Sequence, residues 1–396
     1  MELLKRYKEL KAQGVSITLM ELKKQLEAEE NSAQPNKPNK SLQEQPVYSS
    51  PVSTPAFVTN YTETPQQPGE ISPQQPQVQP TTTSIFSSQQ QTIQKKETQY
   101  TGNVTPLQTP TVQQEKIKKY ALIGYPLGHS LSAYIHNAGF KSLGINATYE
   151  ILETPPEKLV DRIKFFKSNN FAGFNVTIPL KLPITMFLDE VDASADIVNA
   201  INTVVINPET KELKGYNTDV IGFRNAIPDD ITLAGKSCGV LGTGGAARAA
   251  ITALAQNQVK SIKLFTRNIP NCIELLNFLR ERFPNIEFNA FQIERIRDLS
   301  DIEILVNTTP IGMQGRAADL TPVEENELRT LPQGAVVYDV IYNPKKTILL
   351  KLAQKNGYRT INGVDMFIHQ ALAAEQIWTG KTPDFKDMKI AALENL

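Results

Sequence analysis

The chain has 396 residues, and its 41 lysines and arginines balance its 41 aspartates and glutamates. This balance gives no overall electrostatic reason to bind nucleic acid or an anionic membrane. No run of 18 apolar residues predicts a membrane span, and no signal-peptide stretch opens the chain, so we expect a cytoplasmic protein. Two cysteines, expected to be buried free thiols, and three histidines predict neither a disulfide framework nor a metal site.

The N-terminal part differs in composition from the rest. Leucines recur at helical spacing within residues 1–30, which predicts a short helical hairpin whose partner the sequence does not identify. Residues 31–115 are rich in Gln, Pro, Ser and Thr, which predicts a disordered linker. We therefore expect that deleting residues 1–115 changes activity and thermal stability little.

From about Lys116 the pattern is that of an α/β protein. In a first unit we expect strands at 120–124, 146–152, 171–177, 203–206 and 213–217, and helices at 132–143, 156–168 and 193–200. A second unit begins after Asp230, with strands expected at 237–241, 261–265, 304–307 and 335–341. Helices separate these strands, so the second unit is expected to be a doubly wound parallel sheet.

A glycine-rich turn follows the first strand of the second unit. Gly242-Thr243-Gly244-Gly245-Ala246 leads into an alanine-rich helix, the setting in which such a loop binds a dinucleotide pyrophosphate. The next strand ends in Thr266-Arg267-Asn268, which offers no acid to the ribose hydroxyls of NAD. Arg267 therefore favours the 2′-phosphate of NADP, although a ligand-free turn and a solvated arginine stay open as alternatives.

Small polar side chains end the strands and begin the helices of the first unit. They are Ser130 and Ser132, Thr177 and Lys181, and Asn202 and Asp219. Taken alone, Ser132 is explained by a role as helix N-cap, which is the commonest role of a serine at such a position, and a lone lysine is usually solvated. Together, however, such groups suit a hydroxyl-bearing substrate, and a lysine paired with an aspartate can supply the proton that carbonyl reduction requires.

These segments resemble a known family. From about Lys116 to its C-terminus the chain is similar to the shikimate dehydrogenases of the aromatic amino-acid pathway. The resemblance is carried by Gly124–Asn137 (GYPLGHSLSAYIHN), Asn175–Lys181 (NVTIPLK), Ala200–Val204 (AINTV), Gly215–Asp219 (GYNTD), Gly242–Ala249, Asn307–Met313 (NTTPIGM), Asp339–Pro344 and Asn362–Gly380. It implies reversible NADPH-dependent reduction of 3-dehydroshikimate to shikimate. Separately, we expect a monomer or homodimer.

The resemblance also implies a domain plan. A substrate-binding α/β domain would comprise 116–220 and 364–396, and a Rossmann NADP-binding domain would comprise 221–363. In this plan the C-terminal helices return to the first domain.

The resemblance assigns roles to individual residues. Lys181 would be the catalytic lysine and Asp219 its partner. The substrate would be surrounded by Ser130, Ser132, Thr177, Asn202, Asp219, Tyr342 and Gln370. Gly242, Thr243, Gly244, Gly245 and Ala246 would hold the pyrophosphate, Thr266, Arg267 and Asn268 the 2′-phosphate side, and Thr308, Met313, Ile341 and Gly363 the nicotinamide half.

The chain departs from the family pattern at three places. Ala133 replaces a usual proline, Asn199 replaces a common glycine, and Thr266-Arg267-Asn268 is a variant of Asn-Arg-Thr.

The sequence leaves two alternative functions open. One is a relative that prefers quinate, with NAD as a further option, and the other is a ligand-sensing regulator without catalytic activity. Retention of both Ser130 and Ser132 favours shikimate, and retention of Lys181 and Asp219 favours an enzyme.

Overall fold

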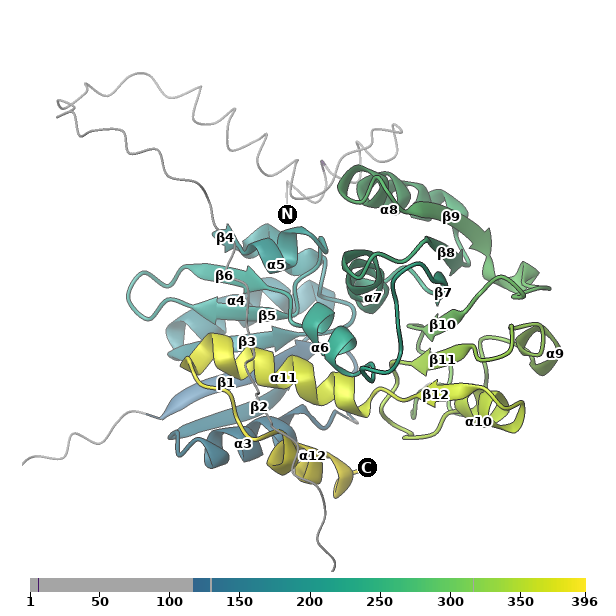
Figure 1. Ribbon diagram of the computed structural model, residues 1–396. Helices are drawn as coiled ribbons and strands as arrows, with labels where there is room; N and C mark the ends of the chain where they lie inside the picture. The colour runs from purple at the N-terminus through teal and green to yellow at the C-terminus, as the bar shows by residue number, and fades with distance from the viewer. Residues whose placement is uncertain (1–5, 7–116, 129, 316) are drawn as a thin grey trace, which may run out of the picture. The chain divides into compact units, whose positions relative to one another are not determined.

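The protein is described by a computed structural model that covers Arg6 and residues 117–396, except residues 129 and 316. All of these residues belong to one of the two compact units of the chain. The predicted hairpin at 1–30, apart from Arg6, and the predicted linker at 31–115 lie outside the described residues. The part from residue 117 onwards contains two six-stranded sheets (Figure 1).

The first sheet is mixed and has the strand order β2-β1-β3-β5-β6-β4. Its strands are β1 (Lys118–Gly124), β2 (Ala147–Glu153), β3 (Phe171–Val176), β4 (Glu190–Val191), β5 (Thr203–Ile206) and β6 (Leu213–Tyr216). Strand β1 pairs in parallel with β2 and β3, whereas β5 runs antiparallel to β3 and β6. The five strands expected here are confirmed, and the short β4 is an addition.

Both faces of this sheet are covered, so its central strand β1 is apolar and buried from Tyr120 to Gly124. Ala121 and Ile123 of β1 pack on the side of α4 (Leu159–Ser168), whereas Tyr120 and Leu122 pack with a side chain of α3 (Ser132–Ser142). This alternation is what a strand buried on both faces requires.

One expected helix of the first unit is shorter than predicted. Helix α5 spans Ala193–Asp196 instead of 193–200. Asn199 has a φ of 51°, in the left-handed region, which a continuing right-handed helix cannot accommodate. The departure from the family pattern at this position is thus conservative in backbone terms, because asparagine is among the non-glycine residues that best tolerate that region.

The second sheet is parallel throughout, with the order β12-β11-β10-β7-β8-β9. Its strands are β7 (Ser237–Leu241), β8 (Ser261–Thr266), β9 (Glu287–Gln292), β10 (Ile304–Asn307), β11 (Val336–Asp339) and β12 (Arg359–Ile361). In chain order this is 3-2-1-4-5-6 from the β9 edge, the arrangement of dinucleotide-binding folds. The expected doubly wound sheet is confirmed, although β9 and β12, the two edge strands, were not predicted.

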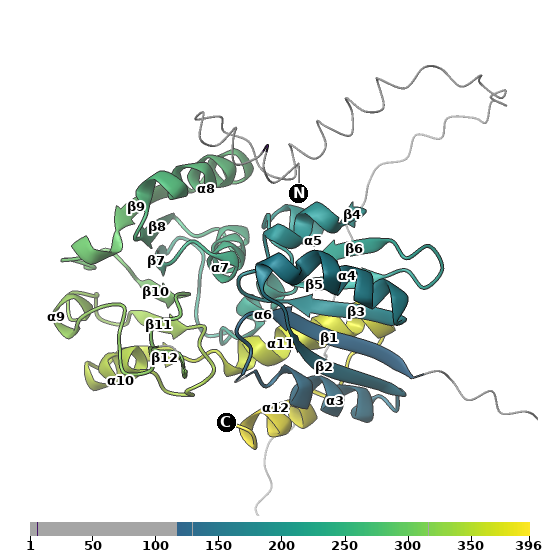
Figure 2. The same ribbon diagram turned by 180° about the vertical axis from the view of Figure 1, so that it is seen from behind.

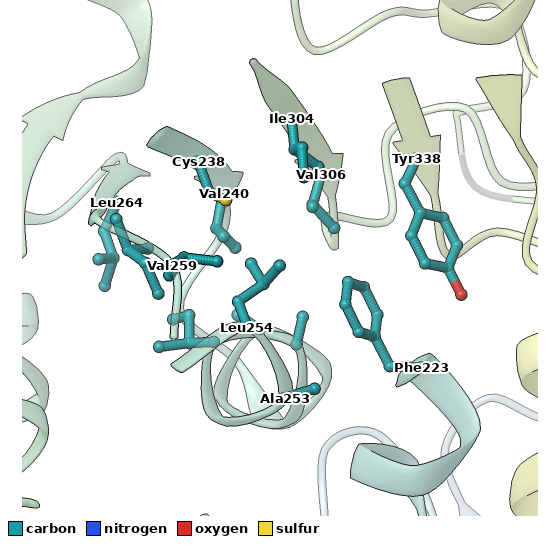
Figure 3. Close-up of a cluster of buried hydrophobic side chains, with 14 of the residues drawn as sticks. Phe223, Cys238, Val240, Ala253, Leu254, Val259, Leu264, Ile304, Val306 and Tyr338 are labelled. Carbon is teal, nitrogen blue, oxygen red and sulfur yellow. The ribbon is translucent and has the colours of Figure 1, made fainter. Parts of the chain in front are cut away.

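Helices cover both faces of the second sheet. They are α7 (Gly245–Gln256), α8 (Ile269–Arg282), α9 (Glu325–Leu328) and α10 (Ile348–Lys355). The first two contribute to one buried apolar cluster, and the last two to another. Figure 3 shows part of the former cluster, in which Leu254 of α7 points toward Val240 of β7. Both cysteines are free and buried, as expected.

Helix α6 (Asp219–Asn225) links the first unit to this second core. Its Phe223 stacks on Tyr338 of β11 with ring centroids 4.6 Å apart (Figure 3). Burial of an aromatic side chain of this kind stabilises a fold by about 1.5–3 kcal/mol. The contact holds α6, whose first residue is Asp219, against β11 of the second sheet.

The C-terminal helices return to the first sheet. Helix α11 (Val364–Thr379) follows β12 and contacts α3, α6, β3 and β5, and α12 (Phe385–Leu393) packs on α3 (Figures 1 and 2). Trp378 of α11 donates a hydrogen bond from Nε1 to the Val204 carbonyl at 3.1 Å and stacks on Tyr120 at 4.7 Å. A Cβ on Gly173 would lie 2.5 Å from that indole nitrogen, so the glycine is needed for this close approach.

None of the helices in the described ranges is long and apolar enough to cross a membrane.

Candidate active site

A cavity of about 490 Å³ is lined by loops at the strand ends of both sheets and by α11. It collects every side chain that was predicted to contact substrate and several that were predicted to contact the coenzyme. The predicted residues that line it are Ser130, Ser132, Thr177, Lys181, Asn202, Asp219, Ala246, Met313, Ile341, Tyr342, Gly363 and Gln370. The predicted residues outside its lining are Gly242, Thr243, Gly244, Gly245, Thr266, Arg267, Asn268 and Thr308.

Lys181 and Asp219 form an ion pair inside this cavity. The Lys181 ammonium donates to Asp219 Oδ2, and the two side chains are only 13% and 8% exposed. Lys181 follows β3, and its backbone carbonyl accepts a hydrogen bond from the Ile201 N–H at 2.9 Å. Asp219 begins α6, and its own N–H donates to Asn217 Oδ1 at 3.0 Å. Both ends of the pair are therefore anchored through the backbone.

Asn202 fixes the orientation of the Asp219 carboxylate. Asn202 Nδ2 donates to Asp219 Oδ1 at 2.8 Å and to Thr218 Oγ1 at 2.9 Å. Its Oδ1 accepts from the Thr218 N–H at 2.8 Å. Because Asn202 occupies one carboxylate oxygen, the other is directed at Lys181. A buried network with all its partners satisfied is rigid, which is what a proton-transfer geometry needs.

The two serines and Tyr342 lie together at another part of the cavity. Ser130 Oγ and Ser132 Oγ are 3.2 Å apart and hydrogen-bonded. The N-cap of α3 is Leu131, with no side-chain capping bond, so Ser132 is not the cap that its position in the sequence allowed. Burial raises the pKa of Tyr342, while a hydrogen bond with Ser130 acts in the opposite direction. Gln370 of α11 donates from Nε2 to the Phe367 carbonyl at 2.8 Å.

The glycine loop has the geometry of a phosphate cradle. Gly242 has a φ of 109°, and a Cβ there would lie 2.7 Å from Thr308 Oγ1, so only glycine fits. Helix α7 begins at Gly245 with no side-chain cap, which leaves the N–H groups of its first turn without intrahelical partners. A Cβ on Gly244 would meet no atom within 4 Å. These features fit a dinucleotide pyrophosphate at the helix N-terminus.

The end of β8 and the residues that follow it lie at the same edge of the sheet. The Gly242 N–H donates to the Phe265 carbonyl at 2.8 Å, so the glycine loop is tied to the end of β8. Thr266 is buried and accepts from the Asn268 N–H at 3.2 Å, whereas Arg267 is exposed. The guanidinium of Arg267 is thus free to reach a phosphate outside the cavity.

A buried carboxyl group that the sequence did not single out connects two loops of the cavity wall. Asp339, at the end of β11, accepts from Thr347 Oγ1 at 2.7 Å and from Asn307 Nδ2 and the Ile341 N–H at 3.1 Å each. Burial raises the pKa of Asp339 to about 6 despite these bonds. Gly363 joins the same wall, because its N–H donates to the Ile341 carbonyl at 3.0 Å.

Asn175 lines the cavity and was missed as a site residue. It accepts from the Tyr149 hydroxyl at 2.7 Å and donates to the Asn202 carbonyl at 3.1 Å and to Thr203 Oγ1 at 3.0 Å. The feature of the sequence that could have identified Asn175 is its amide side chain within the otherwise apolar strand β3.

Behind Tyr149 lies a buried pair, His136 and Glu375, whose Nδ1 and Oε1 are 2.9 Å apart. Burial lowers the pKa of His136 to about 3 and raises that of Glu375 to about 9, so both are neutral near pH 7. Within the residues that the structure describes, no group of three or more His, Cys, Asp or Glu side chains is placed to hold a metal ion.

Comparison with known proteins gives consistent matches. A family model for the shikimate dehydrogenase substrate binding domain matches residues 122–204, and one for the shikimate 5′-dehydrogenase C-terminal domain matches 363–393. A curated shikimate dehydrogenase (NADP(+)) from Caldanaerobacter subterraneus subsp. tengcongensis is 39% identical over 265 residues, which cover 67% of this chain and 92% of the relative.

Solved structures agree with these matches. A shikimate dehydrogenase crystallised in complex with NADP+ is 37% identical with a TM-score of 0.63, and the match covers 70% of this chain and 96% of the other. Shikimate 5-dehydrogenase from Thermus thermophilus, in complex with NADP(H) and shikimate, is 32% identical with a TM-score of 0.61. That match covers 71% of this chain and 100% of the other.

Proposed function

We infer that the chain, which belongs to the shikimate dehydrogenase family, catalyses the reversible NADPH-dependent reduction of 3-dehydroshikimate to shikimate in aromatic amino-acid biosynthesis. The observation that carries the proposal is the Lys181–Asp219 ion pair, which lines one cavity together with Ala246 of α7 and Ile341 of the loop after β11. A proton donor and the loops of a dinucleotide fold thus share one cavity.

Lys181 and Asp219 perform the proton transfer in this proposal. NADPH, when bound, supplies the hydride to the carbonyl carbon. Lys181 Nζ donates a proton to the oxygen as negative charge develops there, and it takes that proton back in the reverse reaction. Asp219 orients the ammonium group, and Asn202 keeps the carboxylate aligned. No metal ion is needed to polarise the carbonyl.

The substrate contacts follow from the same cavity. We assign the ring carboxylate of shikimate to the hydroxyls of Ser130 and Ser132. The ring hydroxyls and carbonyl face the remaining polar side chains, which are Thr177, Asn202, Asp219, Tyr342 and Gln370. A site of this kind discriminates strongly against an analogue that leaves one of its buried polar groups unpaired.

The coenzyme contacts are assigned along the strand ends of the second sheet. Residues 242–246 receive the pyrophosphate, and Thr266, Arg267 and Asn268 receive the 2′-phosphate. Thr308, Met313, Ile341 and Gly363 receive the nicotinamide half. The uncapped start of α7 and the exposed Arg267 support this assignment.

The domain boundaries are retained as part of the proposal. Residues 116–220 and 364–396 form the substrate-binding domain, and residues 221–363 form the NADP-binding domain. A cytoplasmic location and a monomeric or homodimeric state stay predictions of the sequence.

The test is the initial rate of nucleotide reduction by the purified full-length chain, with shikimate or quinate crossed against NADP or NAD. We expect the highest rate with shikimate and NADP. A preference for quinate or NAD would retain the proton-transfer pair but refute the proposed specificity. No rate in any combination would refute the enzymatic proposal and favour a ligand-sensing regulator.

A further inference from the structure

The glycine loop contacts the proposed proton donor. A Cβ atom on Gly245, the first residue of α7, would lie 2.8 Å from Lys181 Cδ, 3.3 Å from its Cβ and 3.5 Å from its Cγ. The aliphatic part of Lys181 therefore fills the space that a side chain at residue 245 would need. The neighbouring Gly244 differs, because a Cβ there would meet no atom within 4 Å.

Backbone conformation does not explain the glycine at residue 245. The glycines with positive φ include Gly242 but not Gly245. Gly245 has helical geometry, which alanine adopts at least as readily. What excludes a side chain there is the neighbouring lysine, so the reason for glycine is space.

We propose that Gly245 is a positioning residue for Lys181, which makes the glycine loop serve proton transfer as well as coenzyme binding. The stem of Lys181 lies against Gly245, its ammonium contacts Asp219, and its backbone carbonyl is bonded to Ile201. These three contacts define where Nζ lies in the cavity. The inference rests on the proposed function in one respect, the role of Lys181 as proton donor.

The cost of a methyl group at residue 245 falls on catalysis more than on folding. The Lys181 side chain is flexible beyond Cβ, so it can turn away from an alanine without disturbing the helix or the strands, but it then loses the stabilising contact with Asp219. The same movement displaces Nζ from Asp219 and from the carbonyl oxygen. Misplacement of a catalytic group by about 1 Å can lower a rate by about 100-fold.

The first experiment compares Gly245→Ala with the matched variant Gly244→Ala in the full chain. We expect Gly245→Ala to lower kcat by about 10- to 100-fold. Its dissociation constant for NADP, measured by calorimetry without substrate, is expected to rise less than that of Gly244→Ala, because backbone N–H groups of the loop receive the pyrophosphate and the new methyl group faces Lys181. Gly244→Ala places its methyl group in open space where the pyrophosphate is expected, so it should weaken NADP binding instead.

The second experiment is a melting-temperature cycle in the coenzyme-free protein, with Lys181→Ala as the second change. If Gly245 accommodates Lys181, Gly245→Ala raises the melting temperature more in the Lys181→Ala background than in the native one, because the steric conflict is gone. Equal shifts in both backgrounds would overturn the proposal. So would a loss of NADP affinity in Gly245→Ala that matches Gly244→Ala while kcat is retained.

The two hypotheses fail separately. Absence of turnover by the native chain would refute the proposed function, whereas the melting cycle would still decide whether Gly245 accommodates Lys181.

Discussion

The two ends of the cavity are built by different means. At the substrate end, buried side chains bond to one another, as Asn202 does to Asp219 and Thr218. At the coenzyme end, the site consists of backbone groups and of glycines that leave room for a ligand, such as Gly242 and Gly244. A substitution at the substrate end leaves buried partners unpaired. A substitution at the coenzyme end instead changes contacts with the coenzyme and leaves the buried hydrogen bonds of the protein intact. The two ends should therefore respond differently to mutation.

The largest expected effect is that of Lys181→Ala at the substrate end. Because general acid catalysis contributes about 10²- to 10⁴-fold, kcat should fall by that factor, while shikimate binding measured by calorimetry stays within a few-fold. Lys164→Ala, which changes an exposed lysine of α4, serves as the control. Unchanged turnover in Lys181→Ala would remove the proton-transfer role from this residue.

Asn202→Ala should reduce both turnover and stability. The change leaves Asp219 Oδ1 and the Thr218 N–H buried without their partner, which costs about 1–3 kcal/mol of unfolding free energy. Turnover should fall by about 10- to 100-fold, because the carboxylate loses its fixed orientation. Urea denaturation and steady-state kinetics measure the two effects, with the exposed Asn285→Ala as the control. If stability falls and turnover does not, Asn202 is structural only.

Arg267→Ala should affect affinity without affecting stability, which is the response that we expect of the coenzyme end. A charge-assisted hydrogen bond to a phosphate contributes about 1.5–3 kcal/mol, so KM for NADP should rise by about 10- to 100-fold. KM for NAD should change little, because NAD lacks the 2′-phosphate. The exposed Arg295→Ala is the matched control. A parallel rise in KM for both nucleotides would contradict the 2′-phosphate assignment.

Glu375→Gln should have the smallest effect on turnover, because Glu375 does not line the cavity but pairs with His136 behind Tyr149. Burial raises the pKa of Glu375 from 4.5 to about 9 in the folded protein. Its contribution to stability is therefore complete below pH 4.5 and is lost as pH rises through about 9. Glutamine mimics the neutral acid and does not ionise, so the variant should match the native protein near pH 4.5 and exceed it in melting temperature at pH 8–9. An equal difference at both pH values would contradict this assignment.

The sequence predicted the fold better at its centre than at its edges. Apolar strands such as Ile304–Asn307 are buried on both faces, and their composition shows it. Strand β9 has the sequence EFNAFQ and lies at an edge, so it has no continuous apolar run to detect. The end of α5 depends on one left-handed residue, Asn199, which propensity alone does not reveal.

The sequence also predicted some parts of the site better than others. The loops that carry Lys181 and Asp219 could be named because polar residues at strand ends stand out from an apolar background. The contacts behind them could not, since His136 and Glu375 are 239 residues apart in the chain. Likewise, the approach of Lys181 to Gly245 depends on how two separate elements pack, and neither segment alone encodes that distance.

The return of α11 to the first sheet has a consequence for synthesis on the ribosome. Trp378 lies 174 residues beyond Val204, the residue whose carbonyl its indole nitrogen contacts. When β1 and β5 leave the ribosome, the helix that covers Tyr120 has not yet been translated. Until the second sheet has been made, Tyr120 is therefore covered by Phe140 of α3 but not by Trp378, and the apolar surface that stays exposed favours aggregation of the nascent chain.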